Sequence, residues 1–165
     1  IVFVLVNVLP GDVGRRVLGP FAPQEKVAEY NHLLGTDRPV ITSVGLVGKT
    51  SILAPHMTQV ILLTDELCQV SARIDGTLEQ GILSGERAAL DIKPDLRLRY
   101  LSQNAVISAG SSVYSTGEGG VFPENLLLGR VKRFENKEIT GEAIIEPSVD
   151  FSMLDYVFVI EMQGP

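Results

Sequence analysis

Apolar and polar residues alternate with a period of two over most of this chain, from Val40 onward. Such alternation is typical of β-strands with one face in a core and the other in solvent. The strand-like runs are short and separated by Gly, Pro, Asp or Asn, which favours a β-sandwich or β-barrel. The pattern predicts strands at residues 40–43, 47–53, 59–64, 69–74, 80–83, 89–92, 96–101, 112–116, 127–134, 139–146 and 156–161, with a hairpin tip at Asn136 and Lys137.

One helix is predicted, at residues 23–34, before the strands begin. Pro23 suits a first helical turn, Glu25 lies near the positive end of the helix dipole, and Gly35 is placed to end the helix. Residues 1–9 are apolar but far shorter than the roughly 20 residues that span a bilayer. We interpret them as the end of a longer apolar segment or as a buried strand.

A glycine-rich corner, residues 110–131, separates two of the predicted strands. We expect Gly117, Gly119, Gly120 and Gly129 to be structural turn residues, because glycine adopts backbone conformations that other residues avoid. The same segment carries three candidate partner-binding residues. Tyr114 and Glu118 would be exposed, and Phe122 would be either a contact residue or a core residue under the turn.

Composition narrows the possible functions. Hydrophobic residues make up 45% of the chain and aromatic residues 6%, with no tryptophan, so the predicted core is aliphatic. The net charge of -6 gives no basic surface for nucleic acid and opposes adhesion to anionic lipid. The single cysteine, Cys68, lies in a strand-like run and is predicted to be a buried apolar residue.

No catalytic or cofactor-binding motif is complete. Residues 45–50, GLVGKT, resemble the end of a phosphate-binding loop, but Ser43 stands where that motif needs glycine, and an extended segment follows. His32 and His56 have no metal-ligand spacing around them. We therefore predict no enzyme activity, cofactor or metal. A serine-type hydrolase using His56, Asp65 and a serine stays open as an alternative.

Seven blocks in order resemble the periplasmic region of the MreC family of rod-shape-determining proteins. They are VITSVGLVGK at 40–49, VILLTD at 60–65, QGILSG at 80–85, LRYL at 98–101, GEGGVFP at 117–123, LGRV at 128–131 and EPSVDFSML at 146–154. Val44 departs from the family, since a polar residue or glycine is usual there. The family's membrane helix and coiled-coil stalk have no counterpart, and neither do the strands that precede Val40. Whether the first barrel is complete therefore stays open.

The resemblance implies a mainly β fold of two small β-barrel-like units, at residues 40–103 and 104–165, after an N-terminal segment (1–39) with one short helix. It implies a non-enzymatic scaffold of the cell-wall elongation machinery on the periplasmic face of the bacterial inner membrane, involved in maintaining cell shape. The implied partners are a class B penicillin-binding transpeptidase, other membrane proteins of that machinery and further copies of the chain. The membrane would be reached only through the missing N-terminal anchor.

Residues 1–39 separately resemble the start of a dipeptide-type ABC transporter permease subunit. Three blocks carry this likeness: LPGD at 9–12, APQEKV at 22–27 and LGTDRP at 34–39. It implies an alternative, that the chain includes a fragment of an inner-membrane permease. The remainder of a permease is absent, so we expect no transport activity.

Overall fold

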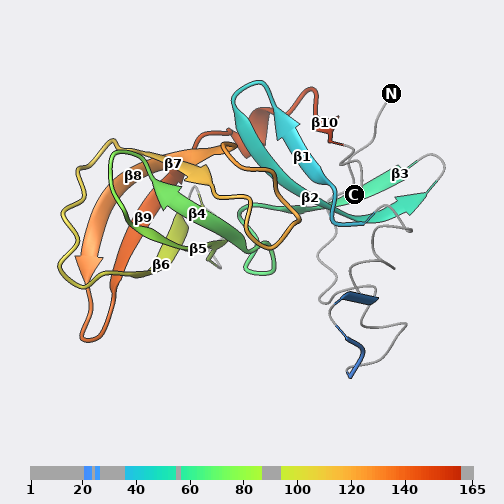
Figure 1. The fold of residues 1–165 in the computed structure, drawn as a ribbon. Coiled ribbons are helices and arrows are strands. Elements are labelled where there is room, and N and C mark those ends of the chain that lie inside the picture. Colours follow the sequence, from blue (N-terminus) through green and yellow to red (C-terminus); the bar gives the residue numbers. More distant parts are fainter. Residues whose placement is uncertain (1–20, 24, 27–35, 55–56, 87–93, 161–165) are drawn as a thin grey trace.

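A computed structural model describes residues 21–23, 25–26, 36–54, 57–86 and 94–160 of the chain. These residues form ten β-strands and one short 3-10 helix (Figure 1). The elements are β1 (Pro39–Thr42), β2 (Gly45–Ala54), β3 (Met57–Leu62), β4 (Val70–Ile74), β5 (Gln80–Gly85), β6 (Leu96–Leu101), β7 (Ser112–Ser115), β8 (Leu127–Asn136), β9 (Gly141–Pro147), η1 (Phe151–Met153) and β10 (Phe158–Val159). The mainly β fold expected from the alternation is confirmed.

Six of the strands close into an antiparallel barrel in the order β4-β5-β6-β9-β8-β7. The period of two is clearest in β4, where Val70, Ala72 and Ile74 are buried and the residues between them are more exposed, and in β7. The inward side chains meet in one core, and closure leaves the barrel without a free strand edge.

The remaining strands form an open sheet in the order β10-β1-β2-β3, which we call sheet A. Its outermost strand, β10, comes from the far end of the chain and pairs with β1 at Val40↔Val159 and Ile41↔Phe158. Figure 1 shows sheet A beside one end of the barrel. Within the described residues, β10 and β3 each pair on one side only.

The core is aliphatic, as the composition predicts, and it continues from the barrel into sheet A. Leu46 of β2 and Leu63 after β3 are fully buried in the same cluster as the barrel residues Leu83, Leu98 and Ile145. A smaller cluster joins Val40, Val47 and Val60 of sheet A to Val149 of the connection after β9. The shared cluster fixes sheet A against the barrel through apolar contact.

The boundary between the barrel and sheet A differs from the predicted boundary at residue 103. The barrel takes β4 to β6 from one side of that boundary and β7 to β9 from the other, while β10 returns to sheet A. The long-range pairs β4–β7 and β6–β9 place the unit boundary in the segment between β3 and β4 instead.

Several predictions concern residues outside the described ranges. They are the segment 1–9, most of the helix at 23–34 and the strand at 89–92. Among the residues that are described, no helix is long and apolar enough to span a membrane.

Cys68 lies between β3 and β4 and is fully buried. Burial is the main reason why its pKa rises from 9.0 to about 12. Because the folded-state pKa is the higher one, the stabilisation is complete below pH 9.0 and is lost as pH rises towards 12.

We expect the free energy of unfolding to fall above pH 9 by about 1.4 kcal/mol per pH unit more in the unmodified chain than in Cys68→Ala. Urea unfolding of both proteins between pH 7 and pH 10 measures the difference. Parallel curves for the two proteins, or rapid reaction of the native thiol with a thiol reagent at neutral pH, would contradict the buried position.

Candidate functional site

The glycine corner of residues 110–131 joins β7 to β8. Gly117, Gly119 and Gly120 have φ angles of 85°, 87° and 71°, in the left-handed region that favours glycine. At Gly119 and Gly120 an added Cβ would meet open space, so the backbone conformation is what requires glycine there. The three residues lie in the connection after β7.

Gly129 has a different role from the predicted turn. It lies within β8 and pairs with Val113 of β7 and Pro147 of β9. A Cβ at this position would overlap the carbonyl oxygen of Glu146. Glycine is needed there because the strands approach closely, and the sequence alone did not distinguish that requirement from a turn.

A buried serine holds the glycine corner closed. The Ser115 hydroxyl donates to the Pro123 carbonyl at 2.6 Å and accepts from the Leu126 amide at 2.9 Å. Phe122 is 5% exposed and belongs to the barrel core. Of the two predicted alternatives for Phe122, the core position is therefore confirmed and the partner-contact role is excluded.

Tyr114 and Glu118 lie on the outer side of the barrel, over β4. The Arg73 guanidinium is 5.4 Å from the centroid of the Tyr114 ring and donates to the Asn125 side chain at 2.8 Å. Glu118 is exposed and accepts from the Ser71 hydroxyl at 3.1 Å. We call these five residues the corner patch. It presents an aromatic ring, a cation and a carboxylate in fixed positions.

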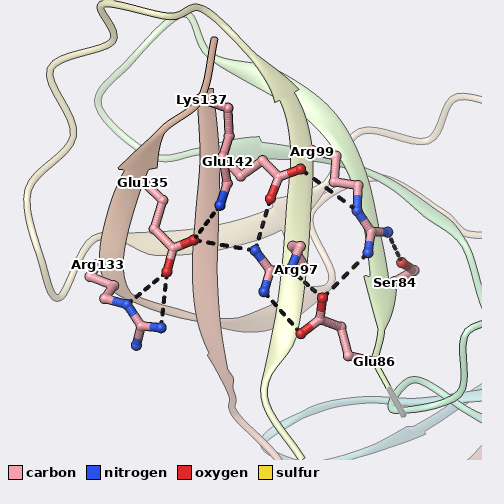
Figure 2. Close-up of polar contacts among 8 residues, drawn as sticks. All are labelled: Ser84, Glu86, Arg97, Arg99, Arg133, Glu135, Lys137 and Glu142. Atoms are coloured by element: carbon pink, nitrogen blue, oxygen red, sulfur yellow. Dashed lines mark hydrogen bonds and ion pairs between the residues drawn. The ribbon is translucent and has the colours of Figure 1, made fainter. Parts of the chain in front are cut away.

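A second polar cluster covers the outer face of β5, β6, β9 and β8 and is shown in Figure 2. Arg97 is at its centre: it bonds both carboxylate oxygens of Glu86, and its Nη1 reaches Glu142 at 2.8 Å and Glu135 at 3.3 Å. The outer members are Arg99, Arg133, Lys137 and Ser84. We call this cluster the charge network.

Oppositely charged neighbours in the charge network shift the pKa values of Arg97 and Glu135 towards their charged forms. The hydrogen bond to Glu86 is the largest cause that raises the pKa of Arg97. The hydrogen bond from Lys137 and then that from Arg133 lower the pKa of Glu135. The charges of four strands are thus mutually satisfied, which indicates a structural role on the barrel wall.

Sequence reasoning missed the charge network. The alternation Arg97-Leu98-Arg99 does place both arginines on one face of a strand. However, the glutamates come from strands up to 45 residues away, and only the β6–β9 pairing brings Glu142 opposite that face.

An open hollow of about 650 Å³ lies beside the charge network. Glu66, Glu86 and Arg99 contribute charges to its lining, and Gln69 and Ser84 contribute polar groups. Within the described residues, no group of three or more His, Cys, Asp or Glu side chains could hold a metal ion. Residues 45–50, which resemble a phosphate-binding loop, lie in the extended strand β2. His32 and His56 are outside the described residues, so the hydrolase alternative is not tested.

Sheet A has an apolar border at its β10 edge. Met153, Tyr156, Phe158 and Val159 are exposed, with Tyr156 the most exposed at 82%. An edge strand with unpaired backbone groups and exposed apolar side chains is a general site for pairing with another chain.

Comparisons with known proteins give one consistent result. The family described as "Rod shape-determining protein MreC, barrel core" matches residues 31–161. The cell shape-determining protein MreC of Cereibacter sphaeroides is 33% identical over 119 residues, covering 71% of this chain and 36% of that protein. The chain thus spans little more than a third of that relative. The family match also includes the last block of the permease-like segment, residues 34–39.

Solved structures show the same fold. The MreC structure from Listeria monocytogenes has a TM-score of 0.67 and 29% identity, covering 75% of this chain and 60% of that one. A chain in the complex between Penicillin-Binding Protein (PBP2) and MreC from Helicobacter pylori has a TM-score of 0.60 and 20% identity. That match covers 73% of this chain and 74% of the other. At this identity it supports the fold alone.

Proposed function

Because the chain belongs to the MreC family of rod shape-determining proteins, we propose that it is a non-enzymatic scaffold of bacterial cell-wall elongation that helps to maintain cell shape. It acts on the periplasmic face of the inner membrane, where it holds peptidoglycan-synthesis proteins together and associates with further copies of itself. Its main partner is a class B penicillin-binding transpeptidase.

The observation that carries this proposal is the combination of a closed barrel with an open sheet. The barrel has every strand paired on both sides, so it is a rigid body that offers no edge. Sheet A keeps β10 and β3 unpaired on their outer sides within the described residues. A rigid unit with an open sheet suits binding by strand addition better than catalysis.

An MreC from Helicobacter pylori forms a complex with the penicillin-binding protein PBP2, and because this chain belongs to the same family we propose a partner of that kind. On this chain we propose the corner patch as the contact, with the half-buried Tyr114 and the exposed Glu118 as the contact groups. A ring, a carboxylate and a cation in fixed geometry provide shape and charge for recognition with little ordering on binding.

Self-association through sheet A is tested at the β10 edge. We expect the chain to self-associate at high micromolar concentration in sedimentation velocity. The double variant Phe158→Lys and Val159→Lys should remain monomeric, because lysine on an edge strand opposes strand addition. Val44→Lys, which places a lysine at another exposed apolar position, is the control.

An unmodified chain that stays monomeric under these conditions would remove self-association from the proposal. If the double variant self-associates as strongly as the unmodified chain, the contact between copies does not lie at β10. Circular dichroism of each variant checks that the β fold is retained.

A further inference from the structure

Three connections meet at the barrel end that points away from sheet A. They are the β4–β5 turn (75–79), the β6–β7 connection (102–111) and the β8–β9 turn (137–140). Alternate strands of an antiparallel barrel run in opposite directions, so these connections share one end. Figure 1 shows the last two at the end of the barrel far from sheet A. We call this end, together with Tyr100, the distal loop surface.

The distal loop surface exposes large apolar side chains that the barrel core does not use. Leu78 is 99% exposed, Val106 90%, Ile139 86% and Tyr100 68%. One exposed apolar residue needs no explanation, but several gathered at one end of a domain indicate a contact surface.

Hydrogen bonds connect the three segments across the barrel end. The Ser102 amide donates to the Glu79 carboxylate at 2.9 Å, which joins the first turn to the second connection. The Gln103 side chain donates to the carbonyls of Lys137 and Glu138 at 3.3 and 3.2 Å, which joins the second connection to the last turn. The apolar side chains are therefore carried on a preorganised base, which favours binding.

Tyr100 has an unfavourable backbone for its residue type. Its φ angle is 69°, in the left-handed region, at the irregularity between Leu98 and Leu101 in the β6–β9 pairing. Its ring does not gain burial from this conformation, since it is 68% exposed. A strained residue with an exposed ring suggests that the ring serves a contact with another molecule.

The charges at this end select the partner. Asp75, Glu79 and Glu138 are acidic, and the only basic residue in the three connections is Lys137, whose ammonium lies 3.1 Å from Glu135. A second copy of the chain, with its net charge of -6, would bring more negative charge. We propose that the distal loop surface binds an amphipathic, lysine- or arginine-containing segment of a partner protein. This contact is separate from sheet A and adjoins the corner patch, since the Asp75 carboxylate lies 3.7 Å from the Arg73 guanidinium.

The test uses a short amphipathic peptide of leucine and lysine as the probe, with a peptide that has glutamate in place of lysine as its control. Amide chemical shifts of the isotopically labelled chain are followed during titration. We expect the leucine–lysine peptide to perturb residues of the three connections. The double variant Leu78→Ser and Ile139→Ser should bind it at least tenfold more weakly.

Tyr100→Gly separates recognition from stability. Because glycine accepts the left-handed backbone, we expect an unchanged or higher unfolding midpoint together with weaker peptide binding. The control, Met153→Ser with Tyr156→Ser, removes apolar side chains elsewhere and should bind like the unmodified chain. Perturbations centred on residues 153–159, equal binding of the glutamate peptide, or unchanged affinity of the Leu78/Ile139 variant would each overturn the proposal.

Discussion

Replacing Gly85 with alanine is expected to lower the free energy of unfolding by about 3 kcal/mol or more. Gly85 ends β5 at the junction between the barrel and sheet A, and its amide donates to the Asp65 carbonyl. A Cβ there would overlap the carbonyl group of Thr64 and lie 2.7 Å from the Asp65 nitrogen. These are backbone atoms, so no change of side-chain rotamer relieves the overlap. Urea unfolding followed by circular dichroism measures the loss.

Gly119→Ala is the matched control for Gly85→Ala. Gly119 has a φ angle of 87° but open space around an added Cβ, so alanine there meets only the backbone penalty, about 1 kcal/mol. The predicted order is a large loss at Gly85 and a small one at Gly119. A Gly85→Ala protein as stable as Gly119→Ala would show that β5 does not approach the Thr64–Asp65 backbone as closely as described.

Replacing Arg97 with methionine is expected to lower the free energy of unfolding by about 2 kcal/mol at neutral pH and low salt. Methionine keeps much of the apolar volume, but it removes the cation that Glu86, Glu135 and Glu142 share. The Arg97 side chain is 19% exposed, so the carboxylates left behind are only partly hydrated. Thermal or urea unfolding at neutral pH gives the difference.

The pH dependence of the stability loss in Arg97→Met shows whether the charge network causes that loss. The pKa of Glu135 is lowered from its ordinary value of 4.5, so its stabilisation is present above that pH and is lost as pH falls through the folded-state pKa. Arg97 also pairs with Glu135, at 3.3 Å, so the stability difference between Arg97→Met and the unmodified chain should shrink once that carboxylate is protonated in acid. Arg133→Met is the control, because that side chain is 61% exposed and should cost much less. A difference that persists unchanged in acid would point to lost packing.

Strand positions could be predicted from the sequence because the information is local. The alternation in β6 and the turn residues between runs indicate which residues extend and which turn. The seven segments that resemble the MreC family predicted the order of these strands along the chain. The β7 and β8 boundaries were predicted to within two residues for the same reason.

The division into units could not be predicted, because it depends on long-range pairing. β10 returns across more than 110 residues to pair with β1, and β7 pairs with β4. Neither pairing has a local signature, since any exposed edge accepts a strand of suitable register. The boundary expected at residue 103 therefore falls inside the barrel.

The candidate residues illustrate the same limit. The positive φ angles of Gly117, Gly119 and Gly120 agree with the expectation that these glycines bend the chain. Gly129 and Phe122 were chosen on the same local grounds, but their environments are made by β9 and by the barrel core. The role of Tyr114 and Glu118 in partner contact stays a prediction, now with a defined geometry over β4.

Titration of the chain with the periplasmic part of a class B penicillin-binding transpeptidase tests the central claim most directly. We predict saturable binding at micromolar concentration or below by isothermal titration calorimetry, and binding at least tenfold weaker for Glu118→Lys, because the substitution reverses the charge of the corner patch. If Glu118→Lys binds the transpeptidase as tightly as the unmodified chain, the partner is correct but the corner patch is not the contact. No binding by a chain that circular dichroism shows to be folded would contradict the scaffold proposal.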